Sequence, residues 1–107
     1  MDVPPVGQDN VGDSFVFTED LFTPGGRLVG HDQVHCTLMF RQELFCEASA
    51  VLSARDEIVA EGVIGAEQRP VLAVVGGTGR FRNARGQVFI LPGATEDETR
   101  LVFALLL

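Results

Sequence analysis

A chain of 107 residues, 46% of them hydrophobic, is long enough for one domain with a single core. Its net charge of −7, with eight arginines and no lysine, excludes nucleic acid and anionic membranes as partners, because phosphate contacts need a concentrated basic face. Two cysteines are too few for a disulfide framework, and neither a metal-ligand spacing nor a cofactor motif is present, so no metal and no cofactor are predicted. The start, MDVPPVGQDN, carries no secretory signal, which favours a cytoplasmic location.

Nearly every segment alternates apolar and polar side chains with a period of two, which is typical of strands with one buried face. Turn signals such as TPGG at 23–26 separate the segments, and no helix of three turns fits between them. Short links between successive strands predict an all-β domain, a small antiparallel up-and-down β-barrel of seven to eight strands, because closure removes exposed edges. In chain order the segments are 13–22, 33–41, 44–54, 57–64, 70–76, 86–91 and 99–107.

One parity of these strands is predicted to face the barrel interior. Small residues on the middle strands, opposite bulky ones on the first two, leave a void that could hold an apolar ligand. The alternative is that neighbouring Phe and Leu side chains fill the space, and the pattern leaves both open. The predicted lining residues are Phe15, Phe17, Val34, Leu38, Phe40, Ala48 and Ala60.

The segment VVGGTGRFRNARGQV at 74–88 raises the question of a phosphate-binding loop. Such a loop needs GxxxxGK[ST] or GxGxxG at the start of a helix, whereas this segment has neither spacing and leads into the strand-like GQVFIL. We interpret it as a structural turn, with Phe81 packed beneath and three arginines at its rim. Arg82 and Arg85 are expected to pair with acidic residues, and the alternative is that they hold an acidic group of a ligand. Positive φ angles are expected at its glycines, Gly76, Gly77, Gly79 and Gly86.

The same segment resembles the signature G-G-x-G-x-F-x-x-x-x-G-x-V that allene oxide cyclases and plant dirigent proteins share. A second block, GDSFVFTEDLFTPGGRLVG at 12–30, resembles the allene oxide cyclase pattern G-D-x-x-x-F-T-x-x-L-Y. The resemblance covers residues 11–107 and implies the small lipocalin-like barrel of that family. Its bacterial members include spirotetronate-forming [4+2] cyclases. A cofactor-independent cyclase or isomerase of bacterial specialised metabolism is therefore implied, closing a ring in a hydrophobic polyene or polyketide-like substrate.

The resemblance also divides the chain. Residues 12–107 are expected to form the single barrel domain. The first strand of the family should precede residue 12, where only the segment 1–11 is present, interrupted by Pro4 and Pro5. This segment is interpreted as a remnant of that strand, which is lost, supplied by a neighbouring chain or truncated.

Two catalytic positions are implied by the resemblance, Glu19 and Cys36. Glu19 replaces a pocket asparagine; a pocket position would raise its pKa and let it bind or protonate a substrate carbonyl, and the alternative is a solvent-facing carboxylate beside Asp20. Cys36 matches a pocket cysteine of the family and is interpreted as a small lining residue. Cys46 lies on the adjacent strand with similar parity, but a stable disulfide is not expected in a reducing cytoplasm.

Three functions follow as alternatives. The first is the cyclase, working mainly by folding its substrate into a reactive shape. The second is a non-catalytic dirigent-like or small-molecule-binding barrel, and the third a structural module with a filled interior. Apolar residues on both faces of the later strands, above all LVFALLL at 101–107, further predict a homo-oligomer, with a dimer first.

Overall fold

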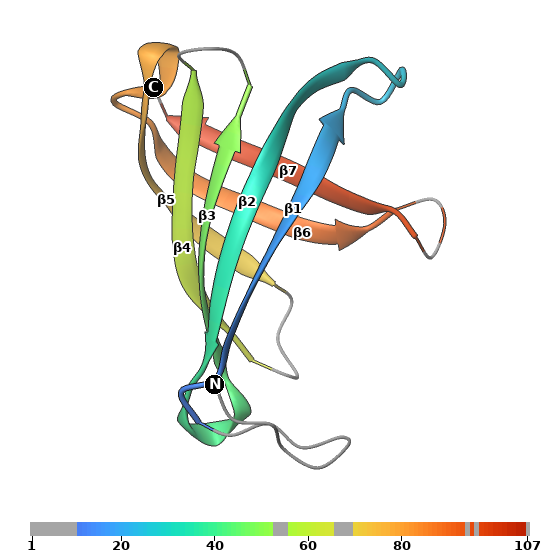
Figure 1. Cartoon of the computed structure of the whole chain (residues 1–107). Helices are drawn as coiled ribbons and strands as arrows, with labels where there is room; N and C mark the ends of the chain where they lie inside the picture. The colour runs from blue at the N-terminus through green and yellow to red at the C-terminus, as the bar shows by residue number, and fades with distance from the viewer. Residues whose placement is uncertain (1–10, 53–55, 66–69, 94, 96, 107) are drawn as a thin grey trace.

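The predicted alternation of side chains corresponds to seven strands in a computed structural model that describes residues 11–52, 56–65, 70–93, 95 and 97–106 (Figure 1). Two short 3-10 turns, η1 (Phe40–Gln42) and η2 (Gly79–Phe81), interrupt the succession. The all-β prediction is confirmed. Of the proposed remnant of a first strand at 1–11, residues 1–10 lie outside the described residues. The strands are β1 (Ser14–Phe22), β2 (Leu28–Leu38), β3 (Leu44–Val51), β4 (Glu57–Ile64), β5 (Val71–Thr78), β6 (Arg85–Pro92) and β7 (Thr99–Leu106).

Each strand pairs antiparallel with its neighbours in sequence, so the sheet has the order β1-β2-β3-β4-β5-β6-β7. The sheet curls on itself, and β6 and β7 cross obliquely behind β1 and β2 (Figure 1). Among the described residues no ladder joins β1 to β7, so the architecture is a curled half-barrel whose concave face is open along one side. The up-and-down topology is the predicted one. None of the described residues belongs to a helix that could cross a membrane.

The curl depends on local departures from a regular ladder. The register shifts between Leu21 and Phe22 and again between Val59 and Ala60, and such bulges increase the bend of a strand. Gly86, at the start of β6, has a φ of 140°, and a Cβ there would overlap the carbonyl oxygen of Ala104 on β7. Glycine at this position is required both by the backbone angle and by the close approach of β7.

The glycine-rich segment is a structural turn, as the sequence predicts, but its glycines act differently from the expectation. Gly79 and Gly86 have positive φ, whereas Gly76 and Gly77 do not. Gly77 is needed for another reason, because a Cβ there would meet the backbone oxygens of Glu57 and Phe81. Two strands and a turn therefore converge at this glycine, and the prediction of four positive φ angles was wrong for two of them.

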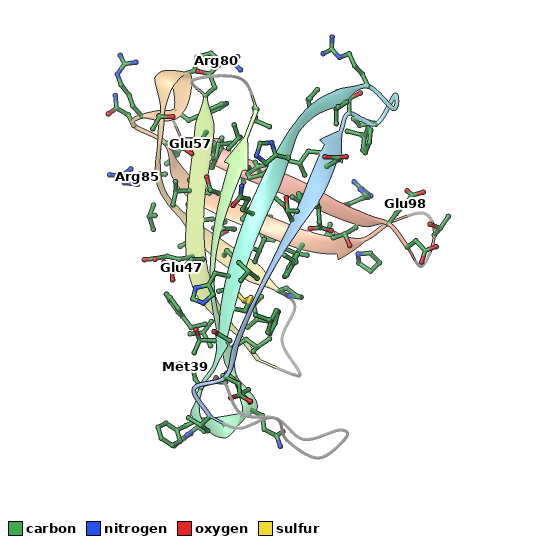
Figure 2. The ribbon with its side chains drawn as sticks, in the orientation of Figure 1. Met39, Glu47, Glu57, Arg80, Arg85 and Glu98 are labelled. Carbon is green, nitrogen blue, oxygen red and sulfur yellow. A yellow bond between two sulfur atoms is a disulfide. The ribbon has the colours of Figure 1, made fainter. Side chains whose placement is uncertain are left out.

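The arginines of this segment lie at the end of the sheet near η2, as Figure 2 shows for Arg80 and Arg85. Arg80 forms a 2.8 Å ion pair with Asp56 and lies over the ring of Phe81, which packs against the core. The side chains of Arg82 and Arg85 donate to backbone carbonyls instead. The prediction that Arg82 and Arg85 pair with acidic residues was therefore wrong within the described part of the chain, and the arginine of this segment that forms such a pair is Arg80.

The core lies beneath the middle of the sheet, and its buried members include Ile58, Leu72, Val74 and Val88. On β7 the side chains alternate, with Leu101, Phe103 and Leu105 facing the core and their neighbours exposed. The outer face of β7 therefore carries exposed apolar side chains, among them Val102 and Leu106, which are the kind of surface on which the predicted subunit contact rests. The homo-oligomer stays a prediction.

We predict that Gly86→Ala lowers the free energy of unfolding by about 2–4 kcal/mol, since the new methyl group must displace β7 and strain the backbone. Gly25→Ala is the matched control, because a Cβ there meets only the Thr23 hydroxyl at 3.8 Å, and the change should stay within about 0.5 kcal/mol. Urea denaturation measures both. Equal effects of the two substitutions would contradict the close approach of β6 and β7.

Candidate functional site

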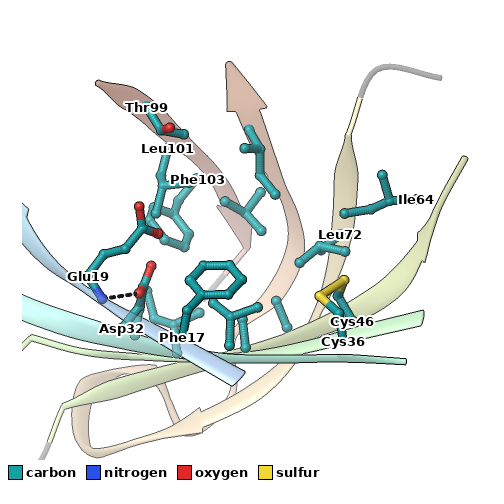
Figure 3. Close-up of a pocket in the computed structure, with 17 residues that line it drawn as sticks. Phe17, Glu19, Asp32, Cys36, Cys46, Ile64, Leu72, Thr99, Leu101 and Phe103 are labelled. Carbon is teal, nitrogen blue, oxygen red and sulfur yellow. Dashed lines mark hydrogen bonds between the residues drawn. A yellow bond between two sulfur atoms is a disulfide. The ribbon is translucent and has the colours of Figure 1, made fainter. Parts of the chain in front are cut away.

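A cleft of about 360 Å³ occupies the concave face of the sheet (Figure 3). Its size falls in the range of small-molecule sites, and its wall is mostly apolar. β1 to β5 form one side and the end, while β6 and β7 face them from across the cleft. Among the lining residues, those predicted from the sequence are Phe17, Glu19, Val34, Cys36, Ala48 and Ala60.

Small side chains on β3 and β4 create this space. Ala48 on β3 lies opposite Ala60 on β4 and Val34 on β2, and all three face the cleft. Because successive residues of a strand point to opposite faces, Ala50 and Ile58 extend the same wall along the ladder. Of the two alternatives left open by the sequence, the open interior is the one observed.

Three predicted lining residues lie elsewhere. Phe15 shares the parity of Phe17 and stacks on it with ring centroids 6.2 Å apart, but it lies outside the cleft and is about half exposed. Leu38 is the last residue of β2 and lies beyond the end of the cleft. Phe40 is 75% exposed in η1. Phe40 was wrongly included because the alternation of the second strand was extended past its end, where positive φ angles at Arg41 and Gln42 turn the chain.

A pair of carboxyl groups lies at one end of the cleft. Glu19 on β1 is directly opposite Asp32 on β2, and the backbone N–H of Glu19 donates to Oδ1 of Asp32 at 3.0 Å (Figure 3). The hydroxyl of Thr18 donates to the backbone carbonyl of Asp32. Asp32 is only 4% exposed, whereas Glu19 is exposed at the mouth. The two alternatives for Glu19 are thus combined, since it lines the cleft and also faces solvent.

Burial raises the pKa of Asp32 from 3.8 to about 6, and the nearby charge of Glu19 adds to the effect. The hydrogen bond from the Glu19 backbone and the proximity of His31 oppose the rise. Asp32 therefore changes its ionisation close to neutral pH, which is uncommon for an aspartate. Across the cleft, the Thr99 hydroxyl group on β7 is a further polar side chain near this end (Figure 3).

Asp32 was missed in the sequence because the second strand was predicted to begin at residue 33. The sequence contained the information, because Asp32 is two residues before Val34 and therefore lies on the same face of the strand as Val34 and Cys36. Extending the strand towards the N-terminus would have placed Asp32 in the interior. The β7 residues Leu101 and Phe103 were also missed as lining residues. Their contact with the cleft depends on how far the sheet curls, which no local pattern reveals.

Cys36 and Cys46 form a disulfide at the other end of the cleft (Figure 3). They face each other across the β2–β3 ladder, with Cα atoms 4.1 Å apart, and both are buried. The expectation that no disulfide forms was therefore wrong: it rested on the compartment, whereas directly opposed residues of one parity bring the two sulfur atoms together. In this form Cys36 has no thiol and lines the cleft as an apolar group.

No three His, Cys, Asp or Glu side chains converge as metal ligands within the described part of the chain. The chemistry that the cleft can support follows from its apolar wall and from the carboxyl groups at one end. An apolar substrate body would bind along Phe17, Phe103 and the alanines, and its polar group would meet a carboxyl group that exchanges a proton near neutral pH.

The sequence matches a family model, the allene oxide cyclase barrel like domain, over residues 2–105, and the chain belongs to that family. Among solved structures the chain is similar to a protein described as a pyocyanin demethylase, with a TM-score of 0.77 and 28% sequence identity. That similarity covers 92% of this chain and 84% of the other. A search of curated proteins finds no match.

The raised pKa predicts a pH-dependent effect of Asp32→Asn on stability. A raised pKa means that protonated Asp32 stabilises the fold, and that this contribution is complete below pH 3.8 and lost as the pH rises through about 6. The variant lacks this loss, so between pH 3.5 and 7.5 its free energy of unfolding should rise by about 2 kcal/mol relative to the unsubstituted chain. Urea denaturation across this range measures the difference. The value at pH 3.5 is the internal control, and a constant difference would show that Asp32 is not desolvated.

The disulfide closes a short loop with a sequence separation of 10. We predict that Cys36→Ala combined with Cys46→Ala lowers the free energy of unfolding by about 2–3 kcal/mol, because the unfolded chain regains the freedom that the bond removes. Reductant should destabilise the unsubstituted chain by a similar amount and leave the double variant unchanged. Two alkylated thiols in unfolded, unreduced protein, measured by mass spectrometry, would contradict the bond.

Proposed function

We propose that the chain is an enzyme that binds a hydrophobic small molecule in the cleft and rearranges it with the help of proton transfer by Asp32. The observation that carries this proposal is an aspartate that is almost fully buried in a mostly apolar cleft and whose pKa burial raises to about 6. Perturbed carboxyl groups in clefts are typical of general acids and bases, whose efficiency is highest when their pKa lies near the working pH.

In the proposed reaction the apolar part of the substrate packs on Phe17 and Phe103, which hold it in one conformation and exclude water. Asp32 in its protonated form donates its proton to a substrate oxygen, and the rearrangement follows. The proton then returns to Asp32 from the product, so that the reaction is an isomerisation and needs no co-reactant. The Glu19 backbone N–H orients the Asp32 carboxyl group through Oδ1.

Within this class we favour ring closure of a polyene or polyketide-like substrate in bacterial specialised metabolism, in keeping with the family. Orientation in a cleft can lower such a barrier by about 7–11 kcal/mol in the best cases. Asp32 would add polarisation of a carbonyl group. A second candidate is the hydrolytic removal of a methyl group from a compound like pyocyanin, with water as the acceptor and methanol as the co-product, which the 28% identity to a protein described as a pyocyanin demethylase supports.

The test compares the unsubstituted chain with Asp32→Asn, which keeps the shape and the Oδ1 acceptor but cannot transfer the proton. Binding of Nile red, a neutral apolar dye, should stay within about twofold, because the apolar wall is unchanged. Product formation from hydrophobic polyenes and from pyocyanin, followed by mass spectrometry, should fall about 10²–10⁴-fold for any compound that is converted. The rate of product formation by the unsubstituted chain should fall as the pH rises through about 6, because Asp32 donates its proton only in the protonated form.

Other outcomes separate the alternatives. Binding without conversion of any compound would favour the non-catalytic barrel. Conversion that survives Asp32→Asn undiminished would contradict the role of Asp32 and leave shape as the source of catalysis. Failure of Nile red to bind would contradict the cleft as a ligand site.

A further inference from the structure

The described residues that line the cleft include two carboxyl groups and no cationic side chain; the positive group that acts on Asp32 is its chain neighbour His31, which lies outside the lining. Among the described residues that line it, Glu19 and Asp32 are the ionisable side chains, and neither forms an ion pair. Arg27 and Arg80, by contrast, line a separate hollow on the surface. An imbalance of this kind is unusual, because buried charges in proteins are normally paired.

The two carboxyl groups also oppose each other. They lie on directly paired positions of β1 and β2, and the charge of Glu19 disfavours ionisation of Asp32. Like charges opposite each other in a sheet are destabilising. Asp32 is more than nine-tenths buried and faces the cleft, where its Oδ1 accepts a hydrogen bond from the Glu19 backbone N–H and a hydrogen bond with the Glu19 side chain favours its protonated form. A positive group in the cleft would relieve the repulsion and satisfy both carboxylates.

The rest of the wall suits the flat apolar body of such a molecule. The ring of Phe17 lies on one side, and Phe103 extends toward it from β7 on the other (Figure 3). Aromatic rings attract cations through their faces, and the attraction increases where water is excluded. A carboxylate ligand would meet two like charges and no cationic side chain in the described part of the wall.

We propose that the cleft selects organic cations with a flat apolar body, such as quaternary nitrogen heteroaromatics, and discriminates against organic anions. This inference rests on the proposed function, since it names the class of molecule that the same cleft accepts. The cationic group lies between Glu19 and Asp32, and the ring system lies between Phe17 and Phe103. The carboxyl groups of the cleft thus determine which ligand charge it accepts, and the same Asp32 carries the proton in the proposed function.

The experiment uses three probes with the same ring system at pH 7.5, the cation N-methylacridinium, neutral acridine and the anion acridine-9-carboxylate. Dissociation constants are measured by fluorescence in 0.15 M salt with the full chain. N-methylacridinium should bind at least about tenfold more tightly than acridine, and the anion at least about tenfold more weakly, because charges in a partly dry cleft interact more strongly than in water.

Two sets of variants locate the effect. Glu19→Gln combined with Asp32→Asn should bring the three affinities within about twofold of one another and leave that of acridine unchanged. Glu47→Gln is the control for net charge, since Glu47 points away from the cleft on the outer face of β3 (Figure 2), and it should keep the full preference. A preference that persists in the double variant would overturn the proposal.

Ala60→Phe places a ring in the cleft and should weaken the binding of all three probes. Val63→Phe, on the outer face of the same strand, should leave their affinities unchanged. Circular dichroism establishes that both variants are folded. Equal binding of the cation and acridine would overturn the charge selection and leave the apolar ligand site of the proposed function intact. Failure of all three probes and of Nile red would overturn both.

Discussion

The site depends on one constraint, the register of a single antiparallel sheet in which each strand pairs only with its neighbours in sequence. Side chains alternate between the two faces, so a pair of opposed residues shares a face, and a slip of one residue would exchange the faces. The register places Glu19 opposite Asp32, Cys36 opposite Cys46 and Ala48 opposite Ala60. All three pairs face the cleft. The acidic end, the disulfide end and the space between them are therefore consequences of one pairing scheme.

The same pairs make the two ends of the cleft chemically different. The disulfide joins β2 to β3 at the apolar end, and the carboxyl groups occupy the other end near the mouth. The alanines between them leave a volume that larger side chains would fill, and an unfilled volume lowers stability. Opposed carboxyl groups in an apolar cleft lower it further. Both features lower the stability of the fold, and neither contributes a stabilising contact in exchange. This is the pattern expected where a site is retained for function.

Local pattern was sufficient for the strands and for which parity faces inward, because both follow from a period of two that the sequence displays directly. It failed where the period begins and ends. Asp32 was missed because the second strand was predicted to begin at residue 33, whereas β2 begins at Leu28, and Phe40 was wrongly included because the strand was continued through a turn. The disulfide was visible as two cysteines of one parity on adjacent strands, and was set aside on an argument about compartment rather than geometry. The part played by Phe103 needed the curl of the whole sheet, which bulges and close-packed glycines determine together.

The carboxyl pair also bears on how catalysis by shape and catalysis by proton transfer relate in this fold. A cleft that only folded its substrate would need no ionisable group, and apolar residues at positions 19 and 32 would give a more stable sheet. With Glu19 and Asp32 in place, the charge of the ligand and the protonation of Asp32 become linked quantities. A neutral ligand that excludes water would raise the pKa of Asp32 further and keep its proton available for donation. A cation would lower the same pKa and leave Asp32 ionised, as a base. The charge that a substrate brings into the cleft would thus determine which of the two roles the buried aspartate takes.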